Sequence, residues 1–251
     1  MVVFERGVGS ETAAGRRAMI GGRRTDRPRD GPAQKETLSV ARPKTPILSK
    51  PVIRRAALEL LDRDGLERLS MRRLAEELDV RAASLYGHYR TKEELLGDIA
   101  DEVTADIDVS GFEGGDWRAG LATWARSYRA ALIEHPNLLP VIASGPGRRE
   151  EALRRADVVH GGLVGAGWPP RYATMIGAST KYLVVGAATR SFARGFDDDA
   201  RVYRDRYPNL SQAHLLAEVA TEIDEDSFEL ALTAFLDGLT PVFETVRTSR
   251  G

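Results

Sequence analysis

Cysteine is absent from the 251 residues of this chain, which excludes disulfides, thiolate metal sites, iron–sulfur clusters and cysteine nucleophiles. The four histidines are too widely spaced to place a metal-binding pair on one helix face. The longest apolar run, residues 182–188, is much shorter than the roughly 20 residues of a membrane helix. The first residues also lack the apolar stretch of a secretory signal. We therefore expect a cytoplasmic protein with no metal site, no cofactor and no membrane contact.

Sequence motifs of common enzymes are also missing. The chain contains no G-x-S-x-G, no H-E-x-x-H and no P-loop, so it has no evident nucleophile elbow, zinc site or phosphate cradle. Residues 144–147 form a Ser-Gly-Pro-Gly turn between helical segments rather than a strand–helix elbow. Three consecutive carboxylates at 197–199 are a weak calcium signal, and we interpret them as a solvated loop. An all-α enzyme remains an alternative, but the sequence disfavours it.

Charge is unevenly distributed along the chain. The net charge is +6 for residues 1–50, +2 for residues 51–92 and −9 for residues 93–251. A basic front and an acidic remainder suggest that the front of the chain meets a polyanion. Residues 1–45 are rich in Gly, Arg, Thr, Ala and Pro and lack apolar periodicity, so we expect a disordered basic arm. An inert tail is favoured over an arm that follows the polyanion.

Helical periodicity begins near Ser49 and continues to the end of the chain, and no alternating strand pattern interrupts it. We expect an all-α protein whose helices form a smaller group at 46–92 and a larger group at 93–251. The first four helices are predicted near 51–62, 71–78, 82–89 and 91–107. The later helices are predicted near 116–134, 137–143, 147–166, 170–194, 211–222 and 226–247.

The segment 69–96 carries the most informative pattern. Ser70 is a good N-cap for a helix with one buried face, and a three-residue turn at 79–81 leads into a second short helix. That second helix has small residues on its outer face, which would let its backbone approach a DNA groove closely. Side chains and helix-end amides on both flanks are placed to meet phosphates. The predicted DNA contacts are Ser70, Met71, Arg72, Arg81, Ala82, Ala83, Ser84, Tyr86, Gly87, His88 and Lys92.

The run R-x-L-A-x-x-L-x-V-x-x-x-x-L-Y-x-H-Y-x-x-K-x-x-L-L within this segment resembles the DNA-binding domain of the TetR family of transcriptional repressors. The resemblance implies that Arg72, Tyr86, His88 and Lys92 contact phosphates or bases. Asp79 stands where the family usually has glycine, and a left-handed backbone costs Asp little more than Gly.

The remainder of the chain is more loosely similar to the regulatory domain of tetracycline repressors, with residues 127–139 as the clue. Val141 and Asp108 stand about where those repressors carry a magnesium-ligating and a drug-contacting histidine. The resemblance therefore does not imply a tetracycline–magnesium site. It implies a helix-turn-helix DNA-binding domain at 46–92 and a helical regulatory and dimerisation domain at 93–251. It also implies a small-molecule effector, a homodimer and a palindromic operator in double-stranded DNA.

Aromatic residues among small ones on the later helices suggest a pocket for an apolar or aromatic effector. Core packing explains the same aromatics, so both interpretations stay open. The predicted ligand contacts are Trp124, Tyr128, His135, His160, Met175 and Tyr182. The resemblance implies that the apolar faces on 170–194 and 226–247 pair with their symmetry mates. The alternative is that both faces only close the protomer core. A nonspecific architectural DNA-binding protein is the main alternative function.

Overall fold

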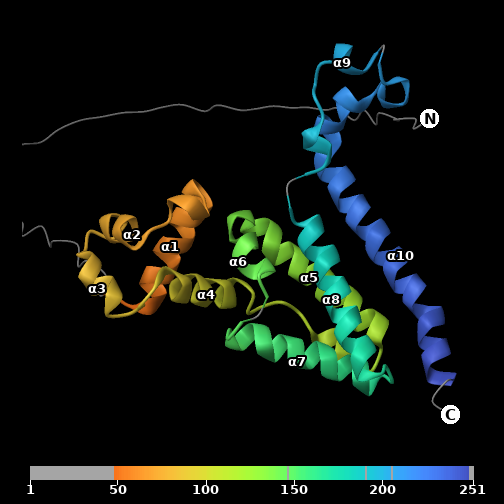
Figure 1. Cartoon of the computed structure of the whole chain (residues 1–251), viewed down its shortest axis with the longest axis horizontal. Coiled ribbons are helices and arrows are strands. Elements are labelled where there is room, and N and C mark those ends of the chain that lie inside the picture. Colours follow the sequence, from red (N-terminus) through yellow and green to blue (C-terminus); the bar gives the residue numbers. More distant parts are fainter. Residues whose placement is uncertain (1–47, 146, 190, 205, 249–251) are drawn as a thin grey trace, which may run out of the picture. The chain divides into compact units, whose positions relative to one another are not determined.

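The computed structural model describes residues 48–145, 147–189, 191–204 and 206–248, which are helical and contain no strand. The predicted arm at 1–45 lies outside these residues. Four helices come first, shown in orange to yellow in Figure 1. Their bounds are α1 Lys50–Asp64, α2 Met71–Glu77, α3 Ala82–Tyr86 and α4 Lys92–Val103, with a 3₁₀ turn at Leu66–Arg68.

Six further helices follow, and the longest of them is α10 (Figure 1). Their bounds are α5 Trp117–Glu134, α6 Leu139–Ala143, α7 Glu150–Gly165, α8 Pro170–Ala187, α9 Arg201–Arg204 and α10 Ala220–Thr248. Short 3₁₀ segments lie at Ser110–Phe112, Pro136–Leu138, Ala193–Gly195, Pro208–Leu210 and Ala213–Val219. No helix among the described residues is long and apolar enough to cross a membrane.

Two predicted helices differ most from the structure. The helix expected over 170–194 ends at Ala187, because a 3₁₀ segment and a loop replace its last part. The helix expected over 211–222 was wrong, because the chain forms a 3₁₀ segment there and α10 already begins at Ala220. The apolar spacing of the two regions resembles an α-helix, but the local hydrogen bonding is of the tighter 3₁₀ kind.

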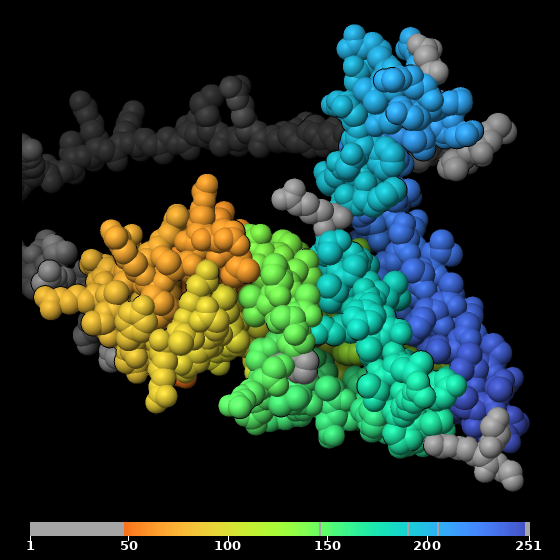
Figure 2. All heavy atoms as spheres, viewed as in Figure 1, coloured from red at the N-terminus to blue at the C-terminus, as the bar shows by residue number. Residues whose placement is uncertain are grey.

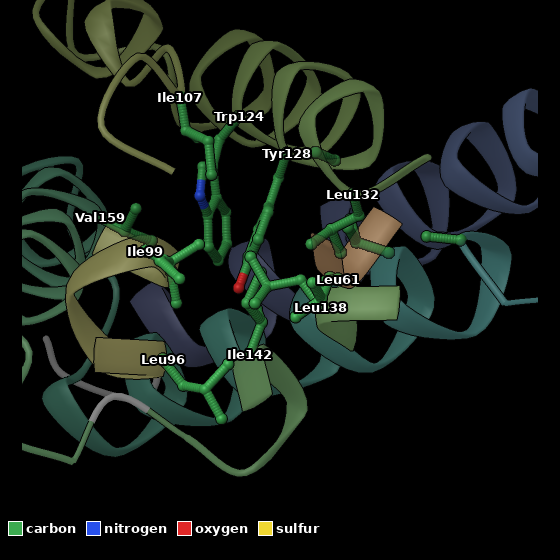
Figure 3. Close-up of a cluster of buried hydrophobic side chains, with 14 of the residues drawn as sticks. Leu61, Leu96, Ile99, Ile107, Trp124, Tyr128, Leu132, Leu138, Ile142 and Val159 are labelled. Atoms are coloured by element: carbon green, nitrogen blue, oxygen red, sulfur yellow. The ribbon is translucent and has the colours of Figure 1, made fainter. Parts of the chain in front are cut away.

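A single apolar core runs through the described residues from Leu48 onward, which form one compact unit. Figure 3 shows Leu61 of α1 close to Leu132 and Leu138, and Ile99 of α4 close to Trp124. Helix α4 contacts α1 on one side and α6 and α7 on the other, and the surface is continuous there in Figure 2. The expected domain boundary between residues 92 and 93 therefore falls at the start of α4, which packs against α1 and also against the later helices α6 and α7.

The end of α1 is also fixed by polar contacts from the turn after α5. His135 Nδ1 lies 2.8 Å from Asp62 Oδ2, and Asn137 Nδ2 donates to the Leu61 carbonyl at 3.0 Å. These contacts hold the first helix against the larger helical group.

A close approach of backbone and ring fixes the connection between α4 and α5. Phe112 is buried, and its ring lies against Gly120 of α5 and Gly162 of α7. A Cβ atom at either glycine would overlap the ring, so glycine is required at both positions.

Candidate DNA-binding surface and ligand pocket

Helices α2 and α3 form a helix-turn-helix whose local geometry follows from its sequence. Ser70 caps α2, because its side-chain oxygen accepts from the Arg73 N–H at 3.2 Å. Asp79 adopts φ 52°, the left-handed conformation that the turn requires and that Asp tolerates well. Leu85 of α3 is fully buried in the core, and α3 packs against α2.

The outer face of α3 is exposed, as the predicted DNA-reading role requires. Arg81, Ala83, Ser84, Tyr86 and Gly87 are exposed. This surface carries a cation, two hydroxyl groups and little side-chain bulk, so it fits close approach to a polyanion.

Other predicted contacts are placed differently. The Met71 side chain is buried in the core, so only its backbone N–H could meet a phosphate. Ala82 and His88 are half-buried, while Ser70 and Arg72 are exposed. Arg72 pairs with Glu76 at 3.1 Å, and such an exposed pair yields readily to another anion.

Lys92 occupies an unexpected position. Its ammonium donates to the Leu66 carbonyl at 3.0 Å, and the side chain is half-buried. One of the three ammonium protons is therefore engaged within the protein. The remaining protons can contact a phosphate, but Lys92 also ties the start of α4 to the turn after α1.

A buried tyrosine joins the end of α3 to α4 and α1. The Tyr89 hydroxyl donates to Asp98 Oδ2 at 2.6 Å, and Arg54 Nη1 reaches the same oxygen at 3.1 Å. Burial and the Asp98 carboxylate raise the pKa of Tyr89 above its ordinary range. Burial alone would raise the pKa of Asp98, but the hydrogen bonds from Tyr89 and Arg54 outweigh it and lower that pKa. The position of α3 is thus coupled to α4 by charge as well as packing.

A second candidate site is a cavity of about 350 Å³ among α5, α7 and α8, a volume typical of small-molecule sites. Its rim includes the exposed Ala156 and Thr174, so it opens between α7 and α8. The lining residues are Trp124, Tyr128, Arg149, Ala152, Arg155, Ala156, Val159, His160, Ala173, Thr174, Gly177, Ala178 and Lys181.

Three cations line this pocket, and each one donates to a main-chain carbonyl near a helix end. Arg155 holds the carbonyl of Thr104, the C-cap of α4, and reaches its Oγ1 at 3.1 Å. Lys181 Nζ donates to the Ile142 carbonyl at 3.1 Å, and Arg149 Nη2 to the Gly145 carbonyl at 2.7 Å.

The pKa values of the lining groups reflect this crowding of like charges in a partly buried site. Burial lowers the pKa of Lys181, and the neighbouring Arg149 and Arg155 lower it further. Burial also lowers the pKa of Arg155, against the opposing influence of Tyr128 and Asp101. Burial raises the pKa of Tyr128.

The predicted ligand contacts divide into two groups. Trp124, Tyr128 and His160 line the pocket, and Figure 3 shows Trp124 and Tyr128 extending from α5 into the core. The two aromatic rings are 6.0 Å apart between centroids. The structure does not bring the other three there. His135 pairs with Asp62, as described above, and Met175 and Tyr182 are 50% and 75% exposed on α8.

Sequence reasoning missed the three cations. Arg155 lies on the same helix face as Ala152, Val159 and Leu163, which are buried at spacings of three and four residues. A charge on an otherwise apolar face was therefore the available signal. Among the small residues of the later helices, Gly177 lines the pocket, whereas Gly162 makes room for Phe112.

Metal-binding side chains do not cluster in the described part of the chain. No group of three or more His, Asp or Glu residues there is placed to hold an ion. Val141, at the expected magnesium-ligand position, packs against the apolar core, and the exposed Asp108 carboxylate accepts from the Ser110 N–H at 2.8 Å.

Two family models match the chain over most of its described length. The model of bacterial regulatory proteins of the tetR family matches residues 53–99, and that of the tetracyclin repressor-like C-terminal domain matches residues 112–243. Both resemblances inferred from the sequence, the strong one and the weaker one, are thereby confirmed.

Individual relatives agree with this assignment. The tetracycline repressor of class A from transposon 1721 of Escherichia coli is 31% identical over 207 residues, which cover 78% of this chain and 93% of the relative. An HTH-type transcriptional regulator of Saccharopolyspora erythraea is 32% identical over 62% of this chain, although the match spans only 66% of that relative.

Solved structures show the same fold. The Streptomyces coelicolor TetR family protein ActR, in complex with actinorhodin, has a TM-score of 0.63 and 26% identity, covering 78% of this chain and 98% of ActR. TetR from Acinetobacter baumannii AYE has a TM-score of 0.60 and 27% identity, covering 78% of this chain and 98% of that protein. The helix-turn-helix, the all-α fold and both family matches agree: this chain belongs to the TetR family of bacterial regulatory proteins.

Proposed function

We propose that this protein is a cytoplasmic transcriptional repressor that binds a palindromic operator and is released from it by a small-molecule effector. The observation that carries the proposal is the exposed, small-residue face of α3 in a helix-turn-helix that matches the family model over residues 53–99. The protein acts by binding, and we propose no catalytic activity for it.

In this proposal the exposed residues of α3 divide by role. Arg81, Ala83 and Ser84 face the major groove and read base edges, while Tyr86 and the flanking Lys92 contact phosphates. The capped N-terminus of α2, at Ser70, Met71 and Arg72, offers backbone N–H groups and a positive dipole end to a further phosphate.

A homodimer supplies the second recognition helix. Met175 and Tyr182 are exposed and seven residues apart on α8, which places them on one helix face. Gly177 and Lys181 of the same helix line the pocket on another face. We propose that Met175 and Tyr182 belong to the dimer interface with the exposed Val242 of α10.

Part of the apolar face predicted on 226–247 is buried within the protomer. Phe228 and Leu232 of α10 are buried in the protomer core. They therefore stabilise each subunit, which agrees with the alternative that this part of the apolar face closes the protomer core.

The domain roles follow from this arrangement. We propose that residues 46–92 bind DNA and that the helices from 93 onward bind effector and partner, with α4 as the shared element. Residues 1–45 are proposed as an accessory arm without an essential role in operator recognition.

Selection of bound sequences from random double-stranded DNA tests the proposal. We expect enrichment of a palindrome whose half-sites lie about one helical turn apart, or a multiple of that spacing. Arg81→Ala should change the enriched bases, whereas Arg171→Ala, which removes an exposed cation from α8, should not. Light scattering of the wild type at micromolar concentration should give a dimer.

The architectural alternative gives a different pattern. It predicts DNA coating with strong salt dependence and no enriched sequence. That result, or a stable monomer in light scattering, would contradict the repressor proposal.

A further inference from the structure

Positive charge is concentrated in the pocket although the surrounding part of the chain is acidic. Residues 93–251 carry a net charge of −9, yet the lining includes Arg149, Arg155 and Lys181 and no carboxylate. Within the described residues, none of these three cations forms an ion pair. The carboxylates of Asp101 and Glu151, which lie outside the lining, offset part of the charge of Arg155. Partly buried like charges without a direct ion pair are still costly, so the site favours an anion.

Unsatisfied hydrogen-bond donors lie among the lining side chains. Arg149 Nη1 and Trp124 Nε1 are buried and have no hydrogen-bond partner. Buried donors are normally paired, so an unpaired one in a pocket indicates where a ligand acceptor can bind. Each of the three cations also donates to a neutral carbonyl. An anion would replace these contacts with stronger, charge-assisted hydrogen bonds.

The rest of the lining fits a flat apolar body. Trp124 and Tyr128 form an aromatic wall on α5, with their planes inclined by 31°. Small residues of α7 and α8, among them Ala152 and Gly177, line the pocket elsewhere. A planar ring system fits between such walls.

We propose that the pocket binds a planar aromatic carboxylate whose anionic group is held by Arg155, Lys181 and Arg149. This inference rests on the proposed function, because it names the chemical class of that regulator's effector. The carboxylate replaces the Thr104 carbonyl as the partner of the Arg155 guanidinium.

Release of Thr104 connects the pocket to the DNA-binding helices. Thr104 is the fully buried C-cap of α4, and a cation there stabilises the helix end. The same helix carries Asp98, which holds Tyr89 at the end of α3. An anion that takes Arg155 away from α4 therefore loosens the element that positions α3.

A matched pair of compounds tests the ligand class with the full-length protein. Anthracene-2-carboxylate and anthracene-2-carboxamide share one ring system and differ in charge. Isothermal titration should give an affinity about tenfold or more higher for the carboxylate. Equal affinities, tighter binding of the amide, or no binding of either compound up to its solubility limit would overturn the proposal.

Variants locate the anion within the pocket. Lys181→Met should lower the affinity for the carboxylate about tenfold or more and leave the affinity for the amide unchanged. Lys181→Arg should restore binding of the carboxylate. Arg171→Met removes a cation from the exposed part of the same helix and should have no effect. If Lys181→Met and Arg171→Met bind the carboxylate alike, the anionic group lies elsewhere.

Operator binding, measured in the same samples, separates this proposal from the proposed function. A protein that selects no DNA sequence fails as a repressor before any compound is added. With operator binding established, saturating carboxylate should lower operator affinity about 5–150-fold. Carboxylate binding that leaves operator affinity unchanged would refute the release of Thr104 as the coupling step.

Discussion

Gly162→Ala should destabilise the protein although alanine favours helices. A Cβ atom at this position of α7 would lie 2.7 Å from both Cβ and Cδ1 of Phe112. The ring has little room to move away, because it also lies so close to the Gly120 backbone that a Cβ there would overlap it. The buried Phe112 belongs to the turn that follows α4, so the substitution perturbs the link between the two functional regions.

The adjacent Gly161 provides a matched control, because a Cβ there meets no atom within 4 Å. Gly161→Ala should stabilise the helix by about 0.5–1 kcal/mol. Overpacking in Gly162→Ala should lower the free energy of unfolding by about 1–3 kcal/mol. The same gain in helix propensity as at Gly161 offsets part of this loss. The free energies of unfolding of the two variants should therefore differ by roughly 1–3 kcal/mol, the full overpacking cost.

Thermal unfolding followed by circular dichroism measures this difference. For a protein of this size, 1–3 kcal/mol corresponds to about 2–12 °C in Tm. Protein concentration must be held constant, since dimerisation makes Tm concentration-dependent. Phe112→Leu should reduce the penalty of Gly162→Ala. Equal Tm values for Gly161→Ala and Gly162→Ala would refute the packing argument.

Three other substitutions test local features of the DNA-binding helices. Asp79→Val should cost about 1–2 kcal/mol in chemical denaturation because of its left-handed backbone, whereas Asp79→Gly should be tolerated; equal losses would contradict this. Ser70→Ala should lower the free energy of unfolding by about 1 kcal/mol because the N-cap is lost, and an unchanged denaturation midpoint would exclude that capping role. The hydrogen bonds from Tyr89 and Arg54 lower the pKa of Asp98 in the folded protein. They therefore stabilise the fold fully above the unfolded pKa of about 3.9, and this contribution is lost as pH falls through the lower, folded pKa. The stability advantage of the wild type over Asp98→Asn should therefore be constant above about pH 5 and shrink below pH 4; a gap independent of pH would contradict the assignment.

The sequence predicted the helix-turn-helix well because its signals are local. The Ser70 cap, the left-handed Asp79 and the buried Leu85 all follow from residue type and spacing within a few positions. The exposure of Arg81 and Ser84 follows from the same periodicity. Lys92 differs because its partner, Leu66, lies 26 residues away, and periodicity carries no information on such a contact.

The pocket was harder to predict because it depends on how three helices pack. Trp124 and Tyr128 could be named as aromatic residues, but the same pattern placed Met175 and Tyr182 beside them. Only the packing of α8 shows which of its faces lines the pocket and which is exposed. The role of Arg155 likewise needs the position of Thr104, 51 residues away.

Fluorescence anisotropy with a selected operator and a scrambled duplex of equal length tests the central claim most directly. At physiological salt the wild-type protein should bind the operator at least about 10³-fold more tightly than the scrambled duplex. Equal affinity for the two duplexes, falling together as salt rises, would contradict the identification of this protein as a sequence-specific repressor.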